Sequence, residues 1–136
     1  MTLQEKLAQA AASFVGTPFR LYGRNPDTGL DCVGLLIASL EAVGVYSDRP
    51  TGYALRNSSI EAWLPYTKEW RLRDADADGE ILAGDVLLIS PGPRQHHIQI
   101  ADSSSAVIHA HAGLRRVVRE HISQEPSLEA HWRLEE

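Results

Sequence analysis

The stretch Gly29-Leu30-Asp31-Cys32-Val33-Gly34 decides the fold, because it marks the point where a long loop turns into a helix. Cys32 is the only cysteine among the 136 residues, so it cannot form a disulfide within the chain. Asp31 is of a type that caps helices, and a helix N-terminus lowers the pKa of a thiol placed there. We therefore expect Cys32 to be a nucleophile, with a buried and inert thiol as the alternative.

Helical patterns lie on both sides of this stretch. The capping pair Thr2 and Glu5 begins a first helix that ends before the loop, and a second helix runs from Cys32 to a stop at Gly44. Residues 16–31 between them are rich in glycine and proline, which predicts a loop. Ordered loops of this length are often functional.

Strand patterns follow in the second half of the chain. A capping signature at Ser58 and Glu61 first predicts a short helix that ends near Pro65. The predicted strands are residues 86–89, 97–101, 106–111, 116–122 and 132–134. Helices first and strands second predict an α+β domain with helices packed on a small antiparallel sheet. The length favours a single domain over residues 1–136.

Histidines on two of these strands are candidates for the base that a thiol nucleophile needs. His97 alternates with Ile98 and Ile100, so its side chain is expected to face away from the core, toward a groove or solvent. His109 occupies a similar position on the next strand, where it could fix the tautomer of the first imidazole. A solvated surface histidine is the alternative interpretation of His97.

Five strings of the sequence together resemble the NlpC/P60 cysteine peptidases in order and spacing. They are Gly16-Thr17-Pro18-Phe19-Arg20, Gly29-Leu30-Asp31-Cys32-Val33-Gly34, Ala83-Gly84-Asp85-Val86-Leu87, His97-Ile98-Gln99-Ile100 and Ile108-His109-Ala110. The chain resembles in particular the phage-type branch, with peptidases of tail and gene-transfer-agent clusters. The resemblance implies a papain-like α+β fold and hydrolysis of peptidoglycan stem peptides, often at the γ-D-glutamyl–diaminopimelate bond.

Roles for individual residues follow from this resemblance, position by position. It makes Cys32 the nucleophile, His97 the general base and acid, and His109 the group that orients His97. Asp31 is expected beside the nucleophile in a structural rather than a catalytic role, and it is also a candidate for the substrate or oxyanion site. Tyr22 is a candidate to supply a hydroxyl to the substrate or oxyanion site.

The sequence also departs from the family pattern near these residues. Val33 stands where the family usually has serine, Gln99 where it has glycine, and Phe19 near where a tyrosine is often found. Gln99 is therefore a further candidate for contact with substrate. The departures motivate two alternatives: a non-catalytic structural or wall-binding component of a phage-like tail, and an amidase or acyltransferase that uses the same trio on another substrate.

Two metal-site patterns compete with this interpretation. Cys32 with His97, His109 and His111 could ligate zinc, but no tight ligand pair is present. The acidic run from Asp74 to Asp85 mimics a calcium loop, although a solvated turn is favoured because its flanks are not clear helices. We therefore expect no metal and no cofactor.

Charge and termini bear on partners and location. The net charge of −5 gives no support to nucleic acid or an anionic membrane as partner. The N-terminus shows no signal-peptide pattern, so we expect cytoplasmic synthesis, followed by assembly into a phage-like tail or release to the cell wall. In the less informative stretch 45–80, the aromatic residues Trp63, Tyr66 and Trp70 are expected in the core rather than in a substrate groove.

Overall fold

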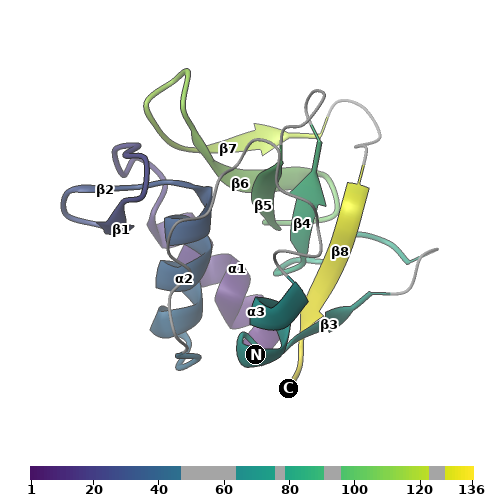
Figure 1. Ribbon diagram of the computed structural model, residues 1–136. Coiled ribbons are helices and arrows are strands. Elements are labelled where there is room, and N and C mark those ends of the chain that lie inside the picture. The colour runs from purple at the N-terminus through teal and green to yellow at the C-terminus, as the bar shows by residue number, and fades with distance from the viewer. Residues whose placement is uncertain (47–63, 76–78, 91–95, 123–127) are drawn as a thin grey trace.

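The computed structural model describes residues 1–46, 64–75, 79–90, 96–122 and 128–136 (Figure 1). The helices of these ranges are α1 (Leu3–Ser13), α2 (Cys32–Ala42) and α3 (Leu64–Glu69). The strands are β1 (Arg24–Asn25), β2 (Gly29–Leu30), β3 (Leu72–Asp74), β4 (Val86–Ile89), β5 (His97–Ala101), β6 (Ala106–His111), β7 (Arg116–His121) and β8 (Leu128–Leu134). No helix in the described part of the chain is long and apolar enough to span a bilayer.

A six-stranded sheet forms one layer, with the strand order β3-β8-β4-β5-β6-β7. Every neighbouring pair in it is antiparallel. The hairpin β1–β2 forms a separate two-stranded sheet within the loop that precedes α2. The α+β class with helices on an antiparallel sheet, expected from the sequence, is confirmed.

Helices α1 and α2 pack on one face of this sheet, as Figure 1 shows. The alternation within the strands explains why: Ile98, Ile100 and Ile108 turn toward the helices and are buried in the common core. Helix α2 is apolar on most sides and contacts β5 and β6 as well as α1. Its N-terminus is thereby held against the middle of the sheet.

Several element predictions agree with the structure, and others need correction. The Thr2 hydroxyl accepts a hydrogen bond from the Glu5 amide, as the capping pair predicts. The prediction of a helix ending near Pro65 is wrong, because Pro65 lies in the first turn of α3, where its missing amide hydrogen costs nothing. Ser58 and Glu61 lie outside the described residues. The sequence missed β3 and the β1–β2 hairpin, and β8 begins four residues before the predicted strand.

The Asp85 carboxylate joins distant parts of the chain. It is fully buried and accepts hydrogen bonds from the side chain of Gln4 on α1 and from the Leu82 amide. On β8, His131 donates to it at 2.6 Å, and Arg133 donates from two nitrogens at 2.8 and 2.9 Å. Both carboxylate oxygens are therefore engaged by protein groups, which argues against the calcium-loop pattern at this residue.

Candidate active site

The start of α2 is fixed by the side chain of Asp31. This fully buried carboxylate accepts a hydrogen bond from the Gly34 amide at 2.7 Å, which caps the helix. It also accepts bonds from the Tyr22 amide at 2.8 Å and from the guanidinium of Arg24 at 3.1 Å. Asp31 thus ties the preceding loop to the first turn of the helix that begins with Cys32.

The thiol of Cys32 is only 2% exposed. Burial raises the pKa of this thiol from 9.0 to about 12, and the nearby negative charge of Asp31 acts in the same direction. Hydrogen bonding by the backbone amides of Ile98, Val33 and Cys32 opposes the rise but does not cancel it. The expectation of a lowered thiol pKa is therefore wrong, because the cost of desolvating a thiolate exceeds the stabilisation that the helix start provides.

The short pairing between β5 and β6 explains how the Ile98 amide becomes available to the thiol. The two strands pair only at Ile100 with Ile108 and at Ala101 with Val107. Ala101 donates its amide to Asp85 on the other side of β5, so alternation directs the Ile98 amide toward β6. The pairing of β5 with β6 ends at Ile100 and Ile108, and the Ile98 amide hydrogen bonds to the Cys32 sulfur.

The side chains of His97 on β5 and His109 on β6 contact each other beyond the residues at which these two strands pair. The Nε2 atom of His97 lies 2.8 Å from Nδ1 of His109, and the two ring planes stand at 81° to each other. His97 directly precedes Ile98, whose amide contacts the sulfur. The structure therefore places His97 against His109, and places the residue that follows His97 in the chain against the Cys32 sulfur.

Both imidazoles of this pair are biased toward the neutral form. Burial, followed by repulsion from His109 and His111, lowers the pKa of His97 from 6.5 to about 4. Burial also lowers the pKa of His109, although the carboxylate of Glu120 opposes the shift. A neutral imidazole is the form that can act as a general base toward a protonated thiol.

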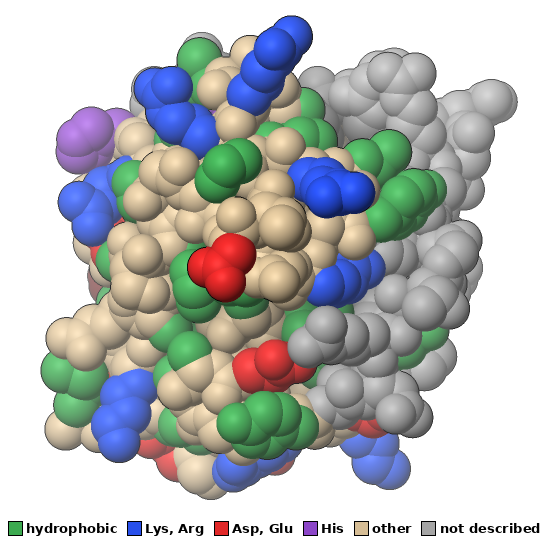
Figure 2. Space-filling model, turned by 90° about the vertical axis from the view of Figure 1, so that its left-hand side faces the viewer, with side chains coloured by type: hydrophobic (Ala, Val, Ile, Leu, Met, Phe, Trp, Pro, Cys, Tyr) green, Lys and Arg blue, Asp and Glu red, His purple; other side chains and the backbone are tan. Residues whose placement is uncertain are grey.

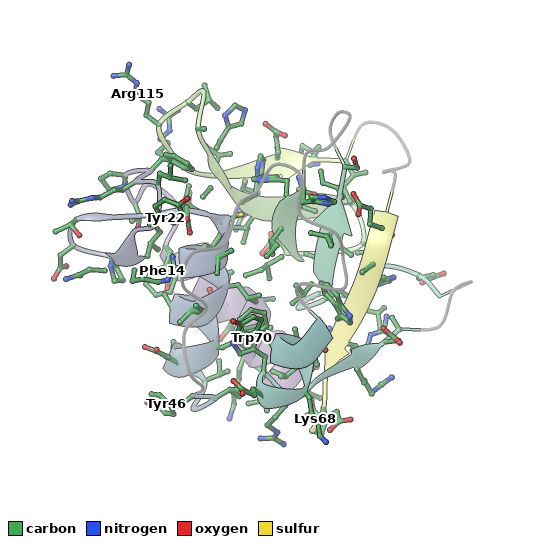
Figure 3. The ribbon with its side chains drawn as sticks, in the orientation of Figure 1. Phe14, Tyr22, Tyr46, Lys68, Trp70 and Arg115 are labelled. Carbon is green, nitrogen blue, oxygen red and sulfur yellow. The ribbon has the colours of Figure 1, made fainter. Side chains whose placement is uncertain are left out.

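The two other candidates for substrate contact lie in different environments. Tyr22 adopts a left-handed backbone conformation with φ of 60°, and its side chain is 54% exposed. Figure 3 places Tyr22 beside the N-terminal end of α2 and Arg115 at the outer tip of the β6–β7 turn. Gln99, by contrast, is buried within β5. Figure 2 shows acidic, basic and apolar side chains interspersed on the face beside the β1–β2 hairpin.

The aromatic residues before β3 belong to the core. Trp70 is 2% exposed and its ring stacks on Tyr66 with the centroids 5.6 Å apart. In Figure 3, Trp70 lies away from the end of α2 that carries Cys32. Core packing, rather than a groove lining, is confirmed for these two residues, and Trp63 lies outside the described ones.

His111 hydrogen bonds to the backbone and not to His97 or His109 in the described contacts. Its Nδ1 accepts a hydrogen bond from the Leu114 amide at 3.0 Å, and its ring lies 5.4 Å from that of His109. Among the residues that the structure describes, no group of three histidine, cysteine or acidic side chains is placed to hold a metal ion.

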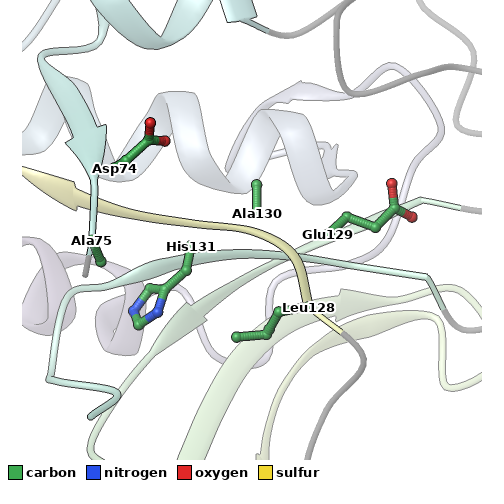
Figure 4. Close-up of a pocket in the computed structure, with 6 residues that line it drawn as sticks. All are labelled: Asp74, Ala75, Leu128, Glu129, Ala130 and His131. Atoms are coloured by element: carbon green, nitrogen blue, oxygen red, sulfur yellow. The ribbon is translucent and has the colours of Figure 1, made fainter. Parts of the chain in front are cut away.

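A cavity of about 300 Å³ lies elsewhere, on the strands β3 and β8 (Figure 4). It is lined by Asp74, Ala75, Leu128, Glu129, Ala130 and His131. Its histidine, His131, already donates to Asp85, and β4 stands between β8 and the strand that carries His97. The cavity is therefore separate from the site at Cys32.

Two groups at the site were not found by sequence reasoning. One is the Ile98 amide, which no side-chain pattern could reveal. The other is Glu120, whose Oε2 lies 3.3 Å from Nε2 of His109. In the sequence Arg119, Glu120 and His121 are all polar, so alternation does not indicate which of them faces the histidines.

The fold and this site define a class, the papain-like α+β proteins with a thiol at a helix start and a histidine pair on the sheet. The family model for NlpC/P60 matches residues 16–134, and the chain belongs to this family. Its members are cysteine peptidases. No curated protein matches the chain.

Solved structures similar to the chain carry the same fold. The NlpC/p60 domain of the peptidoglycan hydrolase SagA has a TM-score of 0.59 at 22% identity, covering 94% of this chain and 96% of that domain. The P60 domain of an antigen from M. avium subspecies paratuberculosis has a TM-score of 0.62 at 18% identity, with coverage of 97% and 93%. NlpC2 from Trichomonas vaginalis has a TM-score of 0.66 at 16% identity, and the match covers 96% of this chain but only 46% of that one. The chain thus spans a little under half the length of this relative.

Proposed function

We propose that the chain is a cysteine hydrolase that cleaves an amide bond in peptidoglycan stem peptides. Membership of the NlpC/P60 family supports the reaction class, and the similar SagA domain comes from a peptidoglycan hydrolase. The observation that carries the proposal is the 2.8 Å contact between His97 Nε2 and His109 Nδ1, directly beside the strand position that contacts the Cys32 sulfur.

In the proposed reaction, His97 takes the thiol proton as the sulfur attacks. The bond to His109 occupies Nε2 of His97, so Nδ1 is the nitrogen left for the Cys32 thiol. The Cys32 proton passes to Nδ1 while the sulfur bonds to the amide carbon, and the carbonyl oxygen becomes an oxyanion. The Cys32 amide, at the first position of α2, is the proposed donor to this oxyanion together with one further group.

The remaining steps return the enzyme to its starting state. The His97 imidazolium gives its proton to the leaving amine as the carbon–nitrogen bond breaks, which leaves a thioester on Cys32. His97 then accepts a proton from water, and the hydroxide adds to the thioester. The tetrahedral species collapses to a carboxylic acid and expels the thiolate, which recovers the proton from His97.

The finer assignments are extensions of this proposal. We propose the γ-D-glutamyl–diaminopimelate bond as the scissile bond, with the exposed Tyr22 at the rim of the substrate site. Assembly with phage-tail proteins, and a location in a tail or at the cell wall, stay predictions of the sequence.

Digestion of purified muropeptides, followed by mass spectrometry, tests the proposal. Wild-type protein is expected to release a fragment whose mass identifies the bond, and Cys32→Ala is expected to release none. Prolonged treatment with iodoacetamide should abolish the same activity, and its effect is attributable to one residue because the chain has a single cysteine. A fragment released equally by Cys32→Ala would overturn the mechanism. An inert wild type that stays bound to peptidoglycan would point to a structural component, and products joined to an added amine would point to acyl transfer.

A further inference from the structure

The side chain of Glu120 on β7 contacts His109 on the side of its ring that faces away from His97. His109 on β6 is paired with Val118 on β7, so Glu120, two residues further on, lies on the same face of the sheet. Its Oε2 is 3.3 Å from Nε2 of His109, while the other ring nitrogen of His109 faces His97 at 2.8 Å. Carboxylate and imidazoles thus form one chain of contacts that leads toward Cys32.

This chain of contacts has one consistent arrangement of protons. An ionised carboxylate only accepts hydrogen bonds, so Nε2 of His109 must carry a proton to donate to Glu120. In a neutral imidazole the other nitrogen is then unprotonated, and Nδ1 of His109 accepts from Nε2 of His97. Nδ1 of His97 is therefore unprotonated, which is the state that a general base needs.

We propose that Glu120 is a positioning residue that fixes the tautomers of His109 and His97 and so keeps the basic nitrogen of His97 available to Cys32. The proposal rests on the proposed function for its effect on catalysis, but not for its effect on the tautomers. No proton passes to Glu120 during the reaction. Its charge favours the imidazolium that forms on His97 when the thiol gives up its proton.

Among the described residues, the other charged and titratable groups around the pair have different partners. His111 lies beside His109 on β6, but its Nδ1 accepts from the Leu114 amide. Asp31 lies behind Cys32 on the loop before α2, where its oxygens are bound to Gly34, Tyr22 and Arg24. Glu120 is the acidic group that the structure places at Nε2 of His109.

The direction of the pH effect follows from the sign of the charge. The carboxylate of Glu120 favours protonated imidazole, so its removal makes the pair less basic. The acidic limb of the profile of kcat/KM against pH should therefore move to lower pH in Glu120→Ala. The side chain of Glu120 is 52% exposed, so we expect a moderate loss, about tenfold in kcat with little change in KM.

NMR of protein labelled with ¹⁵N-histidine tests the tautomers directly. This measurement does not depend on whether the protein is an active hydrolase. In wild type, His109 should show a protonated Nε2 and an unprotonated Nδ1, with signals assigned from a His109→Gln variant. In Glu120→Ala the signals should shift toward a mixture of tautomers, and Glu120→Gln, which keeps an acceptor oxygen, should fall between. Glu135→Ala, which removes another exposed glutamate, is the matched control and should change nothing.

The outcomes separate this proposal from the proposed function. Unchanged His109 tautomers in Glu120→Ala would overturn the positioning role, whatever the activity. The expected tautomer change in a protein that is inert on stem peptides would support the positioning role and refute the hydrolase. Both proposals are supported if the tautomers change and kcat falls together with a shifted acidic limb.

Discussion

The state of the Cys32 thiol is decided by burial rather than by its place at a helix start. A helix N-terminus stabilises a thiolate, and three backbone amides contribute in the same direction here. The surrounding side chains nevertheless exclude water from the sulfur, which is 2% exposed, and a buried charge loses its hydration. The resting site therefore holds a thiol, and in the proposed reaction the nucleophile forms when His97 accepts the proton.

Slow alkylation is the measurable consequence at this residue. With a pKa of about 12 instead of 9.0, the thiolate population near neutral pH is about a thousandfold smaller than that of an ordinary thiol. Iodoacetamide should therefore react slowly with the folded protein, and the rate should still be rising at pH 10. Protein unfolded in urea is the control and should level off near the ordinary thiol pKa. A plateau below pH 9 in the folded protein would contradict the burial argument.

At the residue scale, sequence reasoning identified side chains better than their environments. His97 and His109 do contact each other, and the Ile98 amide next to His97 contacts the Cys32 sulfur; the catalytic roles of the three residues stay a prediction. The pKa of Cys32 was predicted in the wrong direction, because burial depends on residues such as Ile98 that are distant along the chain. Glu120 could not be assigned for the same reason, since its contact depends on the register between β6 and β7.

Among the elements, the junction of the loop and α2 has the tightest backbone packing near the site. A side chain at Gly34 would place its Cβ 2.0 Å from the carbonyl oxygen of Gly23, and one at Gly23 would meet the carbonyl of Gly29 at 2.2 Å. These approaches, with the Asp31 cap, hold the loop against the first turn of α2. The approach to Gly23 explains the glycine at position 34, and the glycine at position 29 is explained by its φ of 142° and by Cβ of Arg20, which a side chain there would meet at 2.6 Å.

Replacing Gly34 by alanine should therefore damage both stability and activity. The added methyl group cannot fit without moving the backbone, and we expect a loss of about 2–3 kcal/mol in the free energy of unfolding. Hydrolysis should fall even at temperatures where the variant is folded, because the start of α2 is displaced. Urea titration and the muropeptide assay measure the two effects.

Gly44→Ala supplies the control for this prediction. Gly44 ends α2 at φ of 90° with open space around it, so alanine there costs only backbone strain, about 1 kcal/mol, at the end of the helix away from Cys32. Equal activity losses in the two variants would refute a specific role for the contact between Gly34 and Gly23.

At the scale of the whole molecule, Asp85 joins the N-terminal helix to the C-terminal strand. Its oxygens bind Gln4 on α1, the Leu82 amide before β4, and both His131 and Arg133 on β8. Burial opposes ionisation of this carboxyl, but the hydrogen bonds from Arg133, Leu82 and His131 outweigh it and lower its pKa. The fold thus depends on a charge that lies far from the site.

Loss of the Asp85 charge should lower the free energy of unfolding of the protein. Asp85→Ala leaves the guanidinium of Arg133 without its carboxylate, and we expect a loss of about 3–5 kcal/mol in the free energy of unfolding. Because the folded pKa of Asp85 lies below the unfolded value of 3.8, its stabilisation is present above that pH and is lost as the pH falls through the folded pKa. Thermal unfolding from pH 7 down to pH 3 should show this decline in wild type, and a weaker one in the variant.

Asp102→Ala is the matched control, since Asp102 pairs with Arg119 at the surface. Removal of that pair should cost less than about 1 kcal/mol. A loss at Asp85 no larger than this would contradict the account of Asp85 as a central connection.

The overall architecture was largely accessible from the sequence, whereas the pairing within the sheet was not. The Thr2 helix cap and the bounds of the strand 97–101 are local patterns, and both agree with the structure, although burial within this strand does not alternate. The order of the strands, with β8 inserted between β3 and β4, depends on contacts between residues far apart in the chain. The short β1–β2 hairpin was missed because two-residue strands leave no periodic pattern.

The pairing between β5 and β6 is too short to set the contact between the two histidines by itself. The two strands pair at Ile100 with Ile108 and at Ala101 with Val107, whereas β4 pairs with β5 as far as His97 and β7 pairs with β6 beyond His109. The 2.8 Å distance between the imidazoles therefore depends on where β4 and β7 hold the two strands. A substitution on β4 or β7 that moves either strand by about 1 Å is enough to break this hydrogen bond, and so should lower the proposed activity without touching any residue that meets the substrate.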